Sequence, residues 1–248
     1  MPRFFIKTEQ IKDHEIIIIG EDVNHIKNVL RKKVGDKLEI CNQETGNIFE
    51  CEISEIKEEQ IVNHIINEDK SQENKILVDI FQGLPKADKM ELIIQKSIEL
   101  GANSITPVEM QRCVVKLDSK SENKKIERWQ KIAESAAKQS GRSTIPQIHR
   151  MVKLEDIIKL KNEYDAIIIC YENEKENYIK KELLKIKKQN KPQNRIAIVI
   201  GPEGGLDEKE VEYLKQQKAT IVTLGDRILR TETVALNLLS IIMYEFEE

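Results

Sequence analysis

The 248-residue sequence lacks the features that would place it in a membrane or in a secretory pathway. Aromatic residues make up only 4% of the chain, and no stretch approaches the roughly 20 consecutive apolar residues that span a bilayer. The N-terminus shows no basic segment followed by a long apolar run. These absences predict a soluble protein that works in the cytoplasm without a membrane partner.

Cysteine and histidine are also sparse, and their spacing matches no known site. The sequence has no C-x-x-C pair, no metal-ligand spacing and no adjacent Cys-His pair. We therefore expect reduced, mostly buried thiols and no bound metal. The residues concerned are Cys41, Cys51, Cys113 and Cys170, together with His14, His25, His64 and His149.

Charge of one sign does not dominate, although 33% of the residues are charged. The 43 acidic and 40 basic side chains leave a formal net charge of -3. Any contact with nucleic acid must therefore come from local basic patches rather than from the overall charge. The apolar fraction of 40% is sufficient for one large or two modest cores.

The first 68 residues or so have the pattern of a small β-barrel. Short β-rich runs alternate with turn signals such as Val34-Gly35-Asp36. One helix interrupts them, starting near Glu21 and ending at the basic residues 31–33, where cations suit the helix dipole. The expected strands cover residues 4–7, 15–19, 37–41, 48–56 and 60–66.

A polar stretch at residues 68–75 contains no aliphatic or aromatic side chain and predicts a boundary between domains 1–70 and 74–248. Beyond it, apolar strands alternate with helices, which indicates a parallel sheet covered on both faces. The expected strands are 76–82, 104–108, 166–171, 196–200 and 220–224. The expected helices are 86–100, 121–140, 154–161, 175–189, 207–217 and 231–247.

The stretch IVIGPEGGLD, residues 198–207, runs from a buried strand into a glycine-rich turn and then a helix that Asp207 can cap. Neither of the common phosphate-binding glycine motifs fits it, and Glu203 would repel a polyphosphate. A neutral or cationic ligand suits the turn better. The alternative is a tight connection that binds nothing.

A second strand leaves the sheet into a glycine turn at Leu224-Gly225-Asp226, followed by another helix. Both turns belong at the carboxyl edge of the sheet, where open α/β folds hold ligands. The final helix, residues 231–247, is apolar on nearly all sides. It therefore packs against a partner subunit or is enclosed within one chain.

These two motifs together carry a resemblance to a known family. The segments 200–205 and 224–233 resemble the paired signature of the RsmE family within the SPOUT methyltransferases. Weaker matches occur at 3–5, 25–31, 95–101, 111–115, 128–129 and 139–142. Two small departures are Val234, where the family often has alanine, and Cys113, where it often has serine.

The resemblance implies an α/β enzyme that transfers a methyl group from S-adenosylmethionine to N3 of a uridine in 16S ribosomal RNA of the small subunit. It also implies an N-terminal PUA-like RNA-binding barrel, a C-terminal SPOUT parallel-sheet domain with a trefoil knot, and a homodimer. No metal is required for this chemistry.

S-adenosylmethionine carries no phosphate, so a glycine turn that includes an acidic residue is compatible with it. The residues implied for cofactor binding are Tyr171, Ile200, Gly201, Pro202, Glu203, Gly204, Gly205, Leu224, Gly225, Ile228, Leu229 and Thr233. Arg230 is the candidate for stabilising negative charge on the uracil. Glu232 or Glu203 is the candidate proton acceptor, although Glu232 also suits the first turn of a helix capped by Thr231.

Contacts to RNA phosphates are expected from basic residues on the barrel helix and on loops near the crevice. These are Arg3, Lys27, Arg31, Lys32, Lys33, Arg112 and Arg142. Three other interpretations stay open from the residues alone. They are a ribose 2′-O-methyltransferase of the same superfamily, a non-catalytic RNA-binding protein, and a nucleotide-binding α/β protein.

Overall fold

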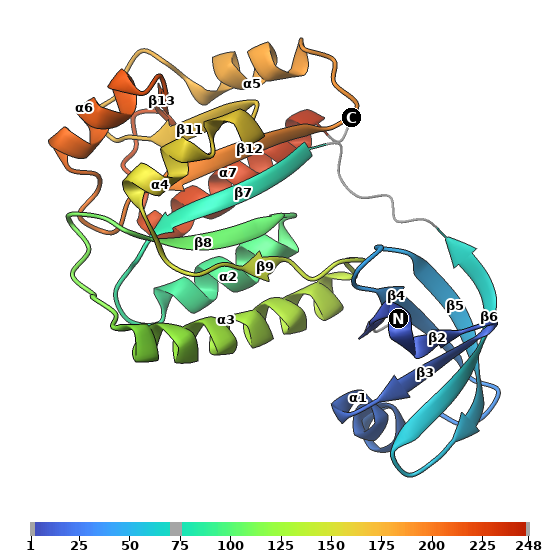
Figure 1. Ribbon diagram of the computed structural model, residues 1–248. Helices are drawn as coiled ribbons and strands as arrows, with labels where there is room; N and C mark the ends of the chain where they lie inside the picture. Colours follow the sequence, from blue (N-terminus) through green and yellow to red (C-terminus); the bar gives the residue numbers. More distant parts are fainter. Residues whose placement is uncertain (1–2, 70–75, 247–248) are drawn as a thin grey trace. The chain divides into compact units, whose positions relative to one another are not determined.

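A computed structural model describes residues 3–69 and 76–246 (Figure 1). Contacts divide the chain into two compact units, residues 1–73 with 137–145, and residues 74–136 with 146–248. Of the linker expected at 68–75, residues 70–75 lie outside the described part of the chain. The domain limits 1–70 and 74–248 therefore stay a prediction.

The first unit is built on one mixed sheet of six strands in the order β1-β4-β5-β6-β3-β2, which curves as a half-barrel (Figure 1). β1 runs parallel to β4, and the other pairs are antiparallel. Alternate side chains such as Phe4 and Ile6 are buried in its core. The strands are β1 (Arg3–Ile6), β2 (Ile11–Lys12), β3 (Glu15–Ile19), β4 (Lys37–Asn42), β5 (Ile48–Ile56) and β6 (Gln60–Asp69).

The expected helix of this unit is present in two parts, α1 (Glu21–Asn24) and the π-helical turn η2 (His25–Val29). It ends where Arg31 takes a positive φ of 53°, which lets the N–H of Lys32 bond back to the carbonyl of Ile26 at 3.0 Å. A short 3-10 turn, η1 (Thr8–Gln10), precedes β2. The basic residues therefore follow the helix end, as the sequence predicted.

The second unit contains the predicted parallel sheet. Its main path has the order β10-β8-β7-β12-β11-β13, β9 pairs with β8, and every pair is parallel. The strands are β7 (Ile76–Gly83), β8 (Ser104–Glu109), β9 (Gln147–Ile148), β10 (Val152–Lys153), β11 (Ala166–Cys170), β12 (Asn194–Ile200) and β13 (Thr220–Val222). The central strands are continuous apolar runs because helices cover both faces (Figure 1).

The helices are α2 (Lys89–Glu99), α3 (Ser119–Ser140), α4 (Leu154–Lys159), α5 (Ile179–Lys187), α6 (Glu208–Gln216) and α7 (Thr231–Phe246), with a 3-10 turn η3 (Lys161–Glu163). The last turn of α3 belongs to the first unit, because most of its contacts are made there. One of these contacts is a 3.0 Å ion pair between Lys138 and Asp22. In the part of the chain that the structure describes, no helix is long and apolar enough to cross a membrane.

Several predicted element limits are wrong, and two of them have a clear local cause. The helix expected from residue 175 begins only at Ile179, because Glu174 Oε1 accepts hydrogen bonds from the backbone N–H groups of residues 175–177 and holds a turn. The helix expected from residue 86 begins at Lys89, after Ala87 takes a positive φ of 52°. The strand expected at 220–224 ends at Val222.

Helix α7 packs against α2 and against strands β7 and β12. Its buried side chains include Ala235, Leu238, Leu239 and Ile242, whereas Tyr244 is 72% exposed. The helix predicted to be apolar on nearly all sides therefore has one face that is buried and one face that is exposed. The trefoil knot is not tested by these strand pairings and stays a prediction.

Candidate functional site

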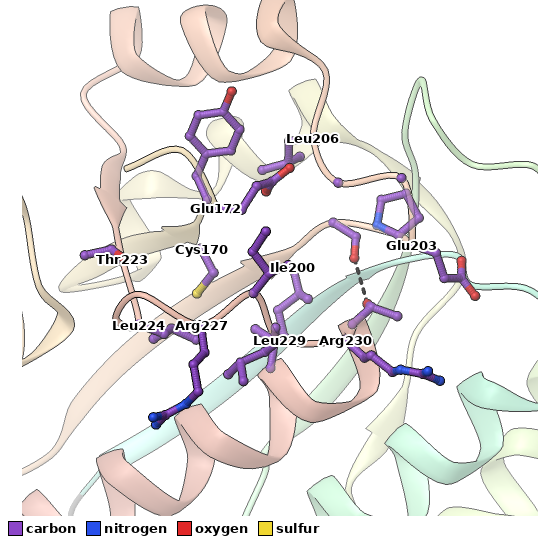
Figure 2. A pocket seen from close by; sticks show the side chains of 18 of the residues that line it. Cys170, Glu172, Ile200, Glu203, Leu206, Thr223, Leu224, Arg227, Leu229 and Arg230 are labelled. Atoms are coloured by element: carbon purple, nitrogen blue, oxygen red, sulfur yellow. Dashed lines mark hydrogen bonds between the residues drawn. The ribbon is translucent and has the colours of Figure 1, made fainter. Parts of the chain in front are cut away.

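A cavity of about 530 Å³ opens at the carboxyl ends of three neighbouring strands of the second unit (Figure 2). β11 lies between β12 and β13, so the turn after β11 sits between the two glycine turns. The lining residues are Lys89, Cys170–Glu172, Ile200–Leu206, Thr223–Thr231 and Val234. The crevice that the two motifs predicted is therefore formed, with a third turn that the motifs did not include.

The first glycine turn folds tightly on itself. The N–H of Gly205 bonds to the carbonyl of Pro202 at 2.9 Å, and Gly205 takes a φ of 70° that favours glycine. A Cβ on Gly201 would lie 2.9 Å from the carbonyl carbon of Gly205, so no larger residue fits there. Asp207 caps α6 by accepting from the N–H of Lys209 at 3.0 Å, which confirms the expected cap.

One hydroxyl joins the two glycine turns. Thr231, the first residue of α7, donates its hydroxyl to the carbonyl of Gly201 at 2.7 Å (the dashed line in Figure 2). The same oxygen accepts from the amide nitrogen of Gln82 at 2.8 Å. Gln82 is fully buried and Thr231 is 6% exposed, so these hydrogen bonds are shielded from water.

Arg112 supports the first glycine turn from outside. Its guanidinium donates to the carbonyl of Gly204 at 3.0 Å and lies 3.5 Å from the carboxylate of Asp207. The sequence assigned Arg112 to RNA phosphates, whereas the structure shows its side chain bonded to the turn that lines the cavity.

The second glycine turn keeps its backbone open to the cavity. Gly225 has a φ of 112°, and its N–H bonds to the hydroxyl of Thr223 at 3.2 Å. Nothing lies within 4 Å of the place where a Cβ of Gly225 would be. Ile228 is 84% exposed beside it, while Leu229 is half-buried. This turn therefore offers open space beside Gly225 and apolar surface to a ligand.

Lys89, which the sequence analysis did not identify, connects the two acidic candidates. Its ammonium lies 3.2 Å from Glu203 Oε1 and 3.4 Å from Glu232 Oε2. The hydrogen bond to Glu203 is the main cause that raises the pKa of Lys89. Lys89 thus keeps both carboxylates on one side of the cavity.

Glu203 remains ionised at neutral pH. Partial burial acts to raise the pKa of its carboxyl, but hydrogen bonds from backbone N–H groups and from Lys89 outweigh it and leave the pKa below its usual value. One of those donors is the N–H of Lys86, at 3.0 Å from Oε1.

Arg230 and Arg227 both line the cavity and are exposed. Within residues 3–69 and 76–246, neither guanidinium has a hydrogen bond or ion pair, so both are available to an incoming molecule. Arg230 immediately precedes α7, and its carbonyl accepts from the N–H of Val234 at 3.0 Å. The position of the Arg230 backbone is therefore set by the helix start.

The turn after β11 contributes Cys170, Tyr171 and Glu172 to the lining. Burial raises the pKa of the Cys170 thiol to about 12, so the thiol stays protonated. All four cysteines are free, and Cys41, Cys51 and Cys113 are buried, as expected. Among the described residues, no group of three or more His, Cys, Asp or Glu side chains could hold a metal ion.

The structure brings nearly all the predicted cofactor-binding residues to the cavity. Thr233 does not line the cavity, because its side chain is on the exposed side of α7. The candidate proton acceptor Glu232 does not line the cavity either, but its carboxylate pairs with the lining residue Lys89. The lining residues that were not predicted are Lys89, Cys170, Glu172, Leu206, Thr223, Asp226, Arg227, Thr231 and Val234. A signal for Cys170 and Glu172 existed, since Cys170 lies at the end of the strand predicted at 166–171 and Glu172 directly follows that strand.

The predicted RNA-binding residues of the first unit differ in availability. Arg3 forms a 3.2 Å ion pair with Glu39 and also bonds to the carbonyl of Gly141. Lys27 and Lys32 donate to backbone carbonyls at 3.1 Å and 3.3 Å. The remaining members of the set are the exposed Arg31 and Lys33 and the half-buried Arg142.

Comparison with known proteins agrees with this site. Residues 72–243 match a family model described as the RNA methyltransferase domain, and residues 18–66 match the RNA methyltransferase PUA domain. The ribosomal RNA small subunit methyltransferase E of Bacillus subtilis (strain 168) is 39% identical over 251 residues, covering 100% of this chain and 98% of that protein.

Two solved structures are also similar. Ribosomal RNA small subunit methyltransferase E from Neisseria gonorrhoeae, bound to S-adenosyl methionine, has a TM-score of 0.80 and 27% identity, with 98% of this chain and 97% of that one covered. A putative methyltransferase from Legionella pneumophila, in complex with the same cofactor, has a TM-score of 0.81 and 27% identity, also with 98% and 97% covered.

The parallel sheet, the cavity at its strand ends and the family models define the class as an RNA methyltransferase with an N-terminal PUA domain. Within that class, the chain belongs to the ribosomal RNA small subunit methyltransferase E family. The resemblance found in the two glycine motifs is thereby confirmed.

Replacing Thr231 with Val keeps the shape of the side chain and removes the hydroxyl that joins Gly201 and Gln82. We expect Thr231→Val to lower the free energy of unfolding by about 1–3 kcal/mol, because two buried polar groups lose a partner. Urea unfolding measures this change. The Thr231→Ser variant keeps the hydroxyl and serves as the control, so an equal loss in both variants would contradict the role of the hydrogen bonds.

Proposed function

We propose that this protein transfers a methyl group from S-adenosylmethionine to small-subunit ribosomal RNA, at N3 of a uridine in 16S rRNA. The observation that carries the proposal is the cavity formed by three strand-end turns, in a chain of the family whose members are named as small-subunit rRNA methyltransferases. An rRNA substrate implies a cytoplasmic location.

The residues of the cavity fit this cofactor. The charged side chains in the lining are Glu172, Glu203 and Asp226 against Lys89, Arg227 and Arg230, so the lining has no excess of positive charge for a polyphosphate. Its volume of about 530 Å³ lies in the range for small-molecule sites. The open space beside Gly225 and the apolar Ile228 and Leu229 suit an adenine ring.

The reaction requires removal of the N3–H proton and stabilisation of the negative charge that the uracil ring then carries. S-adenosylmethionine supplies an electrophilic methyl group on its sulfonium. Arg230 is exposed at the cavity and unpaired among the described residues, so its guanidinium is free to donate to a uracil oxygen.

Glu232 is kept as the candidate proton acceptor predicted from the sequence: it does not line the cavity itself, but its carboxylate pairs at 3.4 Å with Lys89, which does. Glu203 is less suited, since it already accepts from Lys86 and Lys89. Lys89 is the cationic partner of the Glu232 carboxylate, at 3.4 Å from Oε2.

The RNA phosphates are assigned to the basic residues predicted from the sequence. Arg31 and Lys33 follow the helix of the first unit and are exposed, so their side chains can reach RNA phosphates. Lys27 and Lys32 are close in sequence, and Arg3, Arg112 and Arg142 complete the set. We further propose a homodimer and the SPOUT trefoil knot, the former supported by the open face of α7 around Tyr244.

The activity is tested with small ribosomal subunits from a strain lacking this methylation and with labelled S-adenosylmethionine. After digestion of the RNA, mass spectrometry of the nucleosides should show label on 3-methyluridine. Label on a ribose would instead indicate a 2′-O-methyltransferase. Absence of label together with RNA binding would indicate a non-catalytic protein.

Replacing Arg230 with Ala removes the donor proposed for the charged uracil. We expect kcat to fall at least about tenfold, while the affinity for S-adenosylmethionine measured by calorimetry stays within about twofold. The exposed Lys180 of α5 lies outside the cavity, so Lys180→Ala serves as a matched control with unchanged turnover. Wild-type turnover in Arg230→Ala would remove Arg230 from the mechanism.

The homodimer is tested through Tyr244, whose side chain is 72% exposed on α7. We expect wild-type protein to sediment as a dimer and Tyr244→Arg to shift the equilibrium towards monomer, because the substitution would bury a charge in the interface. A monomeric wild type in analytical ultracentrifugation would contradict the dimer.

A further inference from the structure

Glu172 and Asp226 are the two acidic lining residues that the reaction described above does not use, and Glu172 is the one that lies beside the first glycine turn. It follows β11, is exposed and lines the cavity. Its carboxylate lies against the first glycine turn, since a Cβ on Gly205 would overlap Glu172 Oε1 and lie 3.1 Å from its Cδ (Figure 2). Within the described part of the chain, that carboxylate has no hydrogen bond or ion pair.

The carboxylates of Glu203 and Glu174 are occupied in other ways. Glu203 accepts from the N–H of Lys86 and from Lys89, and Glu174 accepts from three backbone N–H groups of its own turn. Those contacts explain the positions of both side chains without a ligand. Glu172 has no such contact, so its two oxygens are left as acceptors beside the glycine backbone.

The position of Glu172 relative to the sheet indicates what it binds. The glycine turn follows β12 and Glu172 follows β11, the strand that pairs with β12 in parallel. In dinucleotide-binding folds, a carboxylate that follows the strand beside a glycine turn accepts a hydrogen bond from a ribose hydroxyl. In both arrangements the carboxylate follows the strand next to the one that leads into the glycine turn. It therefore lies beside the nucleoside that this turn allows to approach closely.

The chemistry of the cofactor favours the ribose over its other donors. The two ribose hydroxyls are neighbouring donors on a part of the molecule without negative charge, and a carboxylate can accept from both. The ammonium of the methionine portion is bonded to a carbon that also bears a carboxylate, which Glu172 would repel. A phosphate in the same place would be repelled as well.

We propose that Glu172 accepts hydrogen bonds from the ribose hydroxyls of S-adenosylmethionine and is a specificity-determining residue of the cofactor site. This inference rests on the proposed cofactor. It assigns the turn after β11 a role that neither glycine motif supplies.

The test measures ligand affinity by titration calorimetry with the full-length protein and its variants Glu172→Gln and Glu172→Ala. The ligands are S-adenosylmethionine, 5′-methylthioadenosine and the 2′-deoxy form of methylthioadenosine. Methylthioadenosine is neutral and keeps the ribose but lacks the amino-acid portion, so its binding reports on hydrogen bonds rather than on attraction between charges.

We expect both variants to bind S-adenosylmethionine and methylthioadenosine about tenfold or more weakly than the wild type, as is typical of hydrogen bonds to a charged group. Loss of the 2′-hydroxyl should weaken binding to the wild type by a similar factor but should change binding to Glu172→Ala little. This non-additivity is a readout that a merely structural role of Glu172 would not produce.

Glu176→Gln is the matched control, because Glu176 is an exposed carboxylate of the same loop that does not line the cavity. Its affinities should equal those of the wild type, and the unfolding midpoints of all variants should stay close together. Weaker binding of S-adenosylmethionine alone would assign Glu172 to the ammonium and overturn the proposal, as would unchanged affinities. Failure of the wild type to bind S-adenosylmethionine would overturn the proposed function itself.

Discussion

The hydrogen bond from the Thr231 hydroxyl to the Gly201 carbonyl is the constraint on which the site depends. It joins the start of α7 to the end of β12, two points that α6, β13 and the second glycine turn separate in the chain. The buried side chain of Gln82 on β7 donates a hydrogen bond to the same hydroxyl. Because these groups are buried, their geometry is fixed before any ligand arrives, and both turns are presented as one surface.

Around that junction, some charged side chains are paired with one another and others are unpaired. Lys89 holds Glu203 and Glu232 on one side of the cavity, whereas Arg230 and Arg227 are left unpaired within the described residues. Glu172 is likewise left free, beside Gly205. Paired charges thus hold the walls of the cavity, and the unpaired ones are the charges to which the proposed function assigns the substrate and the cofactor.

Local features of the structure were predictable from the sequence because they depend on neighbouring residues. The apolar runs that became β7, β11 and β12 were recognised as strands of a parallel sheet, and Asp207 was recognised as a helix cap. The limits failed where a side chain competed with the helix for backbone N–H groups, as Glu174 does before α5. The contact of Arg112 with Gly204 was not predicted, because two residues so far apart in sequence leave no local pattern.

The sequence by itself determined the family, the alternation of strands and helices, and the two glycine turns, since motifs and periodicity are properties of adjacent residues. Only the tertiary structure decided that β11 lies between β12 and β13. That strand order brings Cys170, Tyr171 and Glu172 between the glycine turns, and helix packing brings Lys89 to Glu232. Strand order and helix packing are set by burial over long sequence separations, which no local pattern encodes.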